Sequence, residues 1–271
     1  MIPDDASDDI WRRLTELTPA RIALGRTGSG LPTRASMKFA LAHAQARDAV
    51  HAPLDAAEIA AGLTCLGLVH VIASSRAVSR HSYLLRPDLG RRLDAVSRDA
   101  VAARRATGGV DIAVVIADGL SARAVHTHAI AMTDALLPLI RQNGWSLAPI
   151  VIATQGRVAI GDEIGALLGA RLALVMIGER PGLSSPDSLG MYLTFSPEPG
   201  RTDGERNCLS NIHGAGMSVE EAAFKAAWLM REAFVRRLTG VALKDESGAF
   251  LPNAPEAAAR ALPPGAPSAR E

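Results

Sequence analysis

Apolar residues follow two different patterns along the chain, and the pattern changes near residue 110. Before that point apolar positions recur near the helical period, in alanine-rich stretches such as residues 33–55. Beyond it, short unbroken apolar runs alternate with amphipathic stretches. The first part therefore predicts a helical region, and the second predicts strands that alternate with helices.

Four helices are expected before residue 110, within residues 7–17, 33–55, 55–75 and 86–105. Ser7 and Thr33 are candidate N-caps, because their hydroxyls can accept from the first free N–H groups of a helix. Pro53 forces a boundary after the second helix. The third is expected to be mostly buried, and the fourth is amphipathic.

After residue 110 the apolar runs predict strands within residues 110–119, 147–156, 171–179 and 191–197. Helical patterns lie within residues 120–144, 159–170 and 218–240, the last with Ser218 and Glu221 in capping-box spacing. Strands that are apolar on both faces and alternate with helices belong to a mainly parallel sheet. The expected fold class is α/β: an N-terminal helical region followed by a doubly wound, mainly parallel, Rossmann-like sheet domain.

Three regions follow from this pattern. Residues 1–109 form the N-terminal helical region, and residues 110–245 form the α/β domain. Residues 246–271 are rich in proline and alanine and are expected to form a loosely ordered tail.

Composition excludes several classes of function. The 29 basic residues nearly balance 28 acidic ones, and aromatic residues make up only 4%, so neither charge nor stacking surfaces indicate a nucleic-acid partner. The apolar stretches are too short and interrupted for a membrane span. Two cysteines, far apart, make no disulfide framework and favour a reducing cytosolic setting.

Three successive loops follow predicted strands and combine glycine with polar residues: "ADGLSA", "ATQGRVAIGDEIG" and "GERPGLSSPDSLG". In doubly wound sheets, ligands bind outside the carboxyl ends of the strands. The alternative is that these loops need Gly and Asp only for turn geometry. Three such loops on one edge favour a ligand site.

Familiar catalytic motifs are missing. "GRTGSGLPT" at residues 25–33 precedes any predicted strand, so it is no dinucleotide fingerprint; a phosphate-binding transferase loop is the weaker interpretation, and a flexible loop is favoured. The seven histidines form no zinc pattern, so no metal site is expected. Cys208 lies in the polar stretch "ERNCLSNIHGAG", where a structural cysteine is less expected. These residues alone do not identify a reaction.

The amino-acid sequences of the loops resemble those of a known family. "LTPARIALGRTGSGLPT", "HAQARDAVHAPLD", "RPDLGRRL", "GRVAIGDEIG", "GERPGLSSPDSLG" and "DGERNCLSNIHGAG" occur in this order, and from about Trp11 to Asp245 the chain resembles the small (light) subunit of ethanolamine ammonia-lyase. The resemblance implies an adenosylcobalamin-dependent lyase that converts ethanolamine to acetaldehyde and ammonia by a radical mechanism.

The resemblance also implies a division of labour. A large subunit, a TIM barrel, holds ethanolamine in a hetero-oligomer, and the small subunit covers the cobalamin between them. The family's cobalamin contacts fall on Val158, Glu179 and Cys208, with no catalytic residue in this chain, which is then inactive alone. For Glu179 a salt bridge to Arg180 or another arginine is the structural alternative. The roles of Arg180, Ser184, Ser185 and Asp187 stay open.

The implied setting is the cytoplasm, and many relatives occupy a bacterial microcompartment. The sequence leaves open whether this one does, and how many pairs of subunits assemble. A non-catalytic α/β ligand-binding module is the alternative function. A large subunit that co-purifies with the chain discriminates between the two.

Overall fold

The structure, a computed structural model, describes Trp11, residues 13–18 and residues 20–249. The expected N-cap Ser7 and residues 250–271 of the expected tail lie outside the described residues. Trp11 and residues 13–16 are helical, and the first longer helix is α2 (Thr33–His51).

A six-stranded sheet organises the molecule, in the order β1-β3-β2-β4-β5-β6. The first four strands in that order run parallel, and β5 and β6 are antiparallel to their neighbours. The predicted α/β class with a mainly parallel sheet is therefore confirmed. The strands are β1 (His70–Ser74), β2 (Val110–Ala117), β3 (Ile150–Thr154), β4 (Ala170–Gly178), β5 (Leu189–Phe195) and β6 (Asn207–Ile212).

Helices cover both faces of the parallel strands, as the apolar runs require. On β2, Ile112 and Val114 face one core cluster, and Ala113 and Val115 face the other, so alternate residues fill opposite cores. We call the two sides the α6 face and the α7 face. The first packs against α3 (Ala56–Cys65), α6 (Ala122–Gln142) and α8 (Val219–Arg236), and the second against α5 (Ala95–Ala102) and α7 (Ile160–Leu168).

The single helix expected over residues 55–75 is wrong in its second half. Helix α3 ends at Cys65, and Gly67 adopts a left-handed φ of 72°. The N–H of Leu68 donates to Leu63 O and that of Gly67 to Thr64 O, which is the Schellman pattern that stops a helix. The chain then enters β1, which pairs with β3, so the sheet takes one strand from before residue 110.

The polar stretch at residues 205–216 is also not the loop that its composition predicts. Asn207–Ile212 forms β6, which pairs with β5 and is irregular beside Gly190. Leu209 and Ile212 are buried, whereas Cys208 and Ser210 are exposed. Only one face of this strand is apolar, and this weakens its sequence signal.

Two helix boundaries also differ from expectation. The helix predicted over residues 86–105 is a short 3-10 turn, Leu89–Arg91, followed by α5, which starts where Asp94 accepts from the Ser97 N–H. A short helix that was not expected, α4 (Arg80–Leu85), precedes it. Thr33 is inside α2 and does not cap it, whereas Ser218 caps α8 as predicted.

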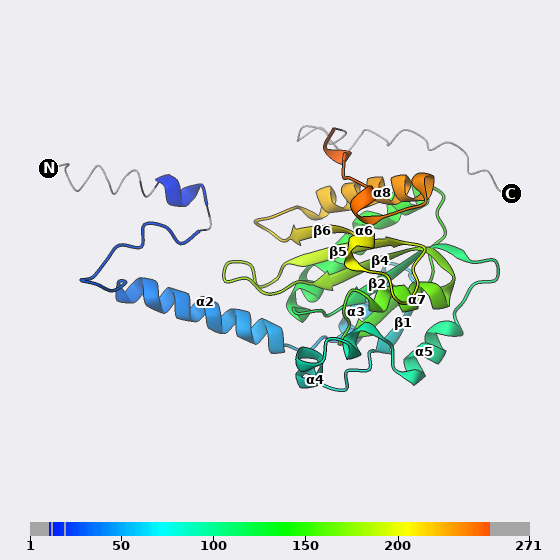
Figure 1. The fold of residues 1–271 in the computed structure, drawn as a ribbon, viewed down its shortest axis with the longest axis horizontal. Helices are drawn as coiled ribbons and strands as arrows, with labels where there is room; N and C mark the ends of the chain where they lie inside the picture. Colours follow the sequence, from blue (N-terminus) through cyan, green and yellow to red (C-terminus); the bar gives the residue numbers. More distant parts are fainter. Residues whose placement is uncertain (1–10, 12, 19, 250–271) are drawn as a thin grey trace.

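Helix α2 extends away from the sheet (Figure 1). Of its residues only Ala49 is buried, and large apolar side chains such as Met37 and Leu41 are exposed. The turn at residues 25–30 belongs to the segment that precedes α2, and it is closed by the pair Thr27 and Gly30. The sheet and its two helical layers therefore carry nearly all of the core.

Candidate functional site

The carboxyl ends of β2, β3 and β4 meet at one edge of the sheet, as predicted. Asp118, directly after β2, is buried and accepts from the Gly156 N–H at 2.9 Å. Its other oxygen lies 3.6 Å from Arg80 Nη1. Burial raises the pKa of Asp118, although these donors oppose the shift. Asp118 therefore connects the loop after β2 to the loop after β3 from a buried position, and it is not exposed to a ligand.

Glu179, directly after β4, is half-buried at the same edge. One carboxylate oxygen accepts from Ser188 Oγ at 2.7 Å and from the Asn211 N–H at 3.2 Å. The other lies 2.9 Å from the point that a Cβ at position 190 would occupy, so a larger residue there would displace the Glu179 side chain. No ion pair involves Glu179 among residues 20–249, so a salt bridge to Arg180 does not explain it.

Cys208 lies on β6 directly opposite Tyr192 of β5. Protein atoms around the thiol raise its pKa by desolvation, the Tyr192 hydroxyl opposes this through a hydrogen bond, and the Glu179 carboxylate adds to the rise. Burial also raises the pKa of Tyr192, with further contributions from Cys208 and Glu179. Both groups are therefore neutral at pH 7. Glu179, Tyr192 and Cys208 form one electrostatically coupled group.

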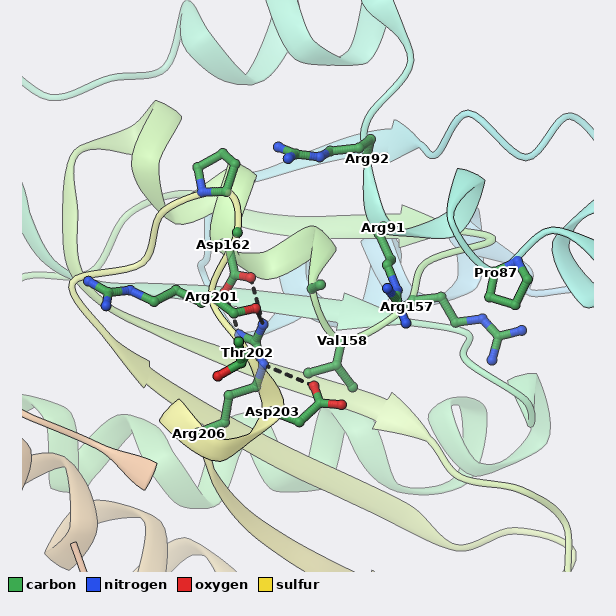
Figure 2. A pocket seen from close by; sticks show the side chains of 13 residues that line it. Pro87, Arg91, Arg92, Arg157, Val158, Asp162, Arg201, Thr202, Asp203 and Arg206 are labelled. Carbon is green, nitrogen blue, oxygen red and sulfur yellow. Dashed lines mark hydrogen bonds and ion pairs between the residues drawn. The ribbon is translucent and has the colours of Figure 1, made fainter. Parts of the chain in front are cut away.

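Val158 is partly buried in the loop between β3 and α7. With Asp203 it lines a cavity of about 550 Å³ on the α7 face (Figure 2). Asp203 also acts electrostatically on Tyr192. Val158 and Tyr192 both pack against the α7-face core, so Val158 lies on the same side of the sheet as Tyr192, the residue that pairs with Cys208.

The two faces of β5 and β6 differ sharply. On the α6 face both strands pack against α8. On the α7 face Cys208 and Ser210 are exposed and Tyr192 is half-buried. We call this side of β5 and β6 the open face. It offers hydroxyl and thiol groups that donate and accept, next to the Glu179 carboxylate, which accepts only.

A buried ion pair supports the floor of the cavity. Arg206, just before β6, donates to both carboxylate oxygens of Asp162, with 2.7 Å between Nη2 and Oδ2 (Figure 2). It also donates to Thr194 Oγ1 at 2.9 Å and to Arg201 O at 2.8 Å. Burial opposes the charge of Arg206, but the carboxylates of Asp162 and Asp203 together more than offset this and raise its pKa. The pair joins the first turn of α7 to the start of β6.

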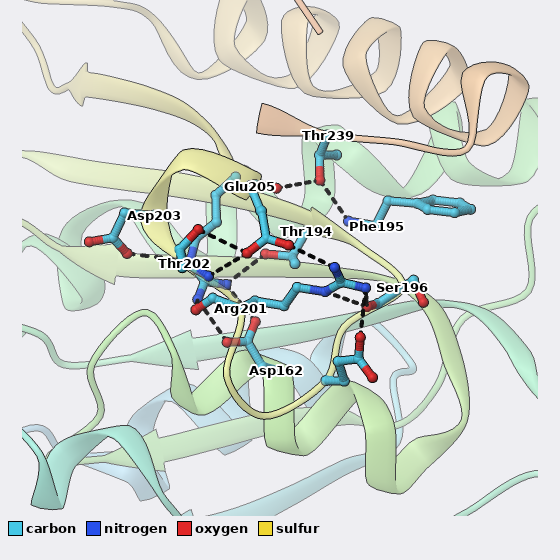
Figure 3. A network of polar contacts seen from close by, with 11 residues as sticks. Asp162, Thr194, Phe195, Ser196, Arg201, Thr202, Asp203, Glu205 and Thr239 are labelled. Carbon is cyan, nitrogen blue, oxygen red and sulfur yellow. Dashed lines mark hydrogen bonds and ion pairs between the residues drawn. The ribbon is translucent and has the colours of Figure 1, made fainter. Parts of the chain in front are cut away.

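The loop between β5 and β6 forms another wall of the cavity. Arg201 pairs with Glu198 and Glu205, and Glu205 accepts from the Thr202 N–H and hydroxyl at 2.7 and 2.8 Å (Figure 3). These bonds, that from the Thr202 N–H above all, lower the pKa of Glu205 to about 2. Thr239 accepts from the Phe195 N–H and donates to Glu205 O, so the loop is fixed at both ends.

Sequence reasoning missed several residues of this region. Tyr192 reads as part of an apolar strand, and the arginines of the cavity are scattered between residues 91 and 206. The glycine-rich stretch at residues 25–30 does not line the cavity. Within the described residues, no cluster of histidine, cysteine and acidic side chains can hold a metal ion, and no helix is long and apolar enough to cross a membrane.

Comparisons with known proteins point to one family. The model of the family described as ethanolamine ammonia-lyase light chain (EutC) matches residues 8–244. The ethanolamine ammonia-lyase small subunit of Bradyrhizobium diazoefficiens is 58% identical over 240 residues, which cover 88% of this chain and 92% of the relative. Those of Xanthomonas campestris pv. campestris and Pseudomonas fluorescens are 56% and 53% identical, over 90% of this chain and 91% and 88% of each relative.

Proposed function

The chain belongs to the ethanolamine ammonia-lyase light chain family, and on that premise we propose that it is the small subunit that covers adenosylcobalamin against a large catalytic subunit. The family is that of a two-subunit ammonia-lyase. The reaction proposed for the assembled enzyme is the conversion of ethanolamine to acetaldehyde and ammonia. Its expected setting is the cytoplasm, with or without a bacterial microcompartment.

The observation that carries the proposal is the uncovered half of one sheet face. A globular chain usually covers both faces of a sheet whose strands are apolar on both sides, and β2, β3 and β4 follow that rule. The open face is instead lined by Tyr192, Cys208 and Ser210. Such a face needs a partner that is both apolar and rich in hydrogen-bonding groups, and a corrin ring with its fringe of amides fits both requirements.

Three residues are proposed to hold the cofactor. Val158 offers an apolar contact in the lining of the cavity. Glu179 accepts hydrogen bonds from amide N–H groups, and its position is already fixed by Ser188. The neutral Cys208 thiol packs its soft sulfur against the ligand.

When bound, adenosylcobalamin supplies the radical that starts the reaction, and the protein supplies position and shielding. The residues of this chain orient the cofactor and exclude water from one side of it. Ethanolamine is expected to bind to the large subunit, a TIM barrel in the proposed hetero-oligomer. No residue of this chain is proposed as a catalytic residue.

Reconstitution tests the proposal. We expect acetaldehyde from ethanolamine when the purified chain, the large subunit and adenosylcobalamin are mixed, and none when any of the three is left out. Deamination by this chain alone would contradict the division of labour. Cobalamin binding without deamination in the full mixture would favour the alternative, a non-catalytic ligand-binding module.

A further inference from the structure

The cavity beside Val158 has an unusual charge balance. Five arginines and two aspartates line it. We call it the arginine pocket; its charged lining residues are Arg91, Arg92, Arg157, Asp162, Arg201, Asp203 and Arg206.

Only part of this positive charge is neutralised within the chain. Arg206 and Arg201 are held by acids, as described above. Neither guanidinium of Arg91 or Arg92 has a hydrogen bond or ion pair within residues 20–249. The acids that interact electrostatically with them, Asp88 with Arg91 and Asp162 with Arg92, already form ion pairs with other arginines. Asp88 pairs with Arg86, and Asp162 pairs with Arg206. The pocket therefore presents uncompensated positive charge to a ligand.

The third arginine is held in place by the fold. Arg157 stacks on the Tyr83 ring at 4.1 Å from the ring centroid and donates from Nη2 to Tyr83 O at 3.1 Å. Its Nε is buried and has no partner. A buried N–H without an acceptor is costly, and an added anion removes that cost.

The turn that carries Arg91 and Arg92 is pressed against the same loop. The Arg157 N–H donates to Gly90 O at 2.8 Å. A Cβ at position 90 would lie 2.8 Å from Arg157 Cγ and 3.0 Å from Gln155 O, so only glycine permits this approach. Residues that lie more than sixty positions apart are therefore built into one pocket, with Arg91 and Arg157 on the same side in Figure 2.

Arginine is the preferred residue for phosphate, because its planar fork gives two parallel N–H bonds to two oxygens. A pocket of about 550 Å³ is large enough for a phosphate with an attached sugar. Since Val158 belongs both to this pocket and to the proposed cofactor surface, the phosphate belongs to a ligand that extends over both. Cobalamin has such a group, the phosphodiester of its nucleotide tail.

We propose that Arg91, Arg92 and Arg157 bind the phosphodiester of the cobalamin nucleotide tail, an inference that rests on the proposed function. The same chemistry would also accept free inorganic phosphate, so the test has to separate the two sources. Arg91 and Arg92 are the residues to change, because Arg157 also supports Tyr83.

The experiment measures binding of two corrinoids to the assembled two-subunit enzyme. Cobalamin carries the nucleotide tail, and cobinamide lacks it together with the phosphodiester. In the double variant Arg91→Gln/Arg92→Gln we expect the Kd for cobalamin to rise roughly 10- to 100-fold, as for lost charge-assisted bonds, and the Kd for cobinamide to stay unchanged. Arg141→Gln removes one positive charge from an exposed arginine at the end of α6 and should change neither Kd.

Each other result overturns the inference. Unchanged cobalamin binding in the double variant means that the arginines do not contact the tail, and the proposed function survives. Equal weakening of both corrinoids means that they act on the fold or the subunit interface. Inorganic phosphate could bind to the wild type and not to the double variant, while the Kd for cobalamin is the same for both proteins. In that case the pocket binds free phosphate only. If the wild-type enzyme binds neither corrinoid, the proposed function fails as well.

Discussion

The parallel and antiparallel parts of this sheet follow different rules. Strands β2, β3 and β4 are covered by helices on both faces, and their side chains are almost all apolar and buried, whereas the edge strand β1 leaves Ile72 half exposed. Strands β5 and β6 are covered by α8 on one face and leave Cys208 and Ser210 exposed on the other. The first part provides the core that makes the fold stable. The second uses that core as a support for a polar surface, where we propose that the cofactor binds.

The two parts are joined by polar contacts, of which one, the Arg206–Asp162 pair, is fully buried. The Arg206–Asp162 pair connects β6 to α7, and Glu179 connects the end of β4 to β5 and β6 through Ser188 and Asn211. The open face is thus held in one position relative to the covered strands. The predictions below test that difference, beginning with the largest effect.

Removing the buried carboxylate should have the largest effect on stability. Asp162→Ala leaves the Arg206 guanidinium buried without its partner, and we expect the free energy of unfolding to fall by about 3–5 kcal/mol. Urea denaturation of the purified chain measures it. Asp134→Ala, at an exposed position of α6, is the control and should stay within about 0.5 kcal/mol of the wild type. A loss below about 1 kcal/mol for Asp162→Ala would show that the pair does not join the two parts.

Truncation of two neighbouring residues of β6 should change the stability by very different amounts. Leu209 is buried against the α6-face core, so Leu209→Ala should lower the free energy of unfolding by about 2–5 kcal/mol. Cys208 points to the open face, and Cys208→Ala should change it by less than about 0.5 kcal/mol. The same denaturation experiment compares them. Similar losses for both would mean that the open face is covered within the chain itself.

Glu179 should matter more for the cofactor than for folding. In the assembled enzyme we expect Glu179→Ala to weaken cobalamin binding roughly tenfold, the equivalent of one hydrogen bond to a charged group. Ser188→Ala removes a structural partner of Glu179 while keeping the carboxylate, and it should retain most of the affinity. If Ser188→Ala weakens binding as much, or if Glu179→Ala leaves it unchanged, Glu179 only supports the loop.

The smallest effect concerns the wall of the arginine pocket. Hydrogen bonds from Thr202 and Arg201 hold the pKa of Glu205 at about 2, below the usual value near 4.3. Because the pKa is depressed in the folded chain, the stabilising contribution is present above about pH 4.3 and is lost as the pH falls through about 2. A carboxyl-carbon NMR titration measures this pKa, and Arg201→Gln should raise it. A value near 4.3 in the wild type would mean that the loop is not held in this way.

The sequence predicted the covered part of the sheet better than the open part. The apolar runs of β2, β3 and β4 are long enough to identify strands without tertiary information. Strand β1 was hidden because it follows the alanine-rich α3 after a turn at Gly67. Strand β6 was hidden because only one of its faces packs, so its exposed side reads as loop.

The site was predictable only in part, for a similar physical reason. Strand ends and glycine-rich loops located the edge that carries Glu179, and the family resemblance supplied Val158 and Cys208 as candidates. The arginine pocket has no local signature, because it forms only when the turn at Gly90 packs against Arg157 from a distant loop. Contacts between distant segments depend on the tertiary fold, and a short motif cannot encode them.

The two cysteines provide the most direct test that the open face holds the cofactor. Both are exposed and free: Cys208 lies on the open face, and Cys65 ends α3 on the opposite side of the sheet. Alkylation of each thiol is measured by mass spectrometry in the two-subunit complex before and after cobalamin is added. We predict that cobalamin abolishes the labelling of Cys208 and leaves that of Cys65 unchanged. Equal labelling of Cys208 with and without cobalamin would contradict the account.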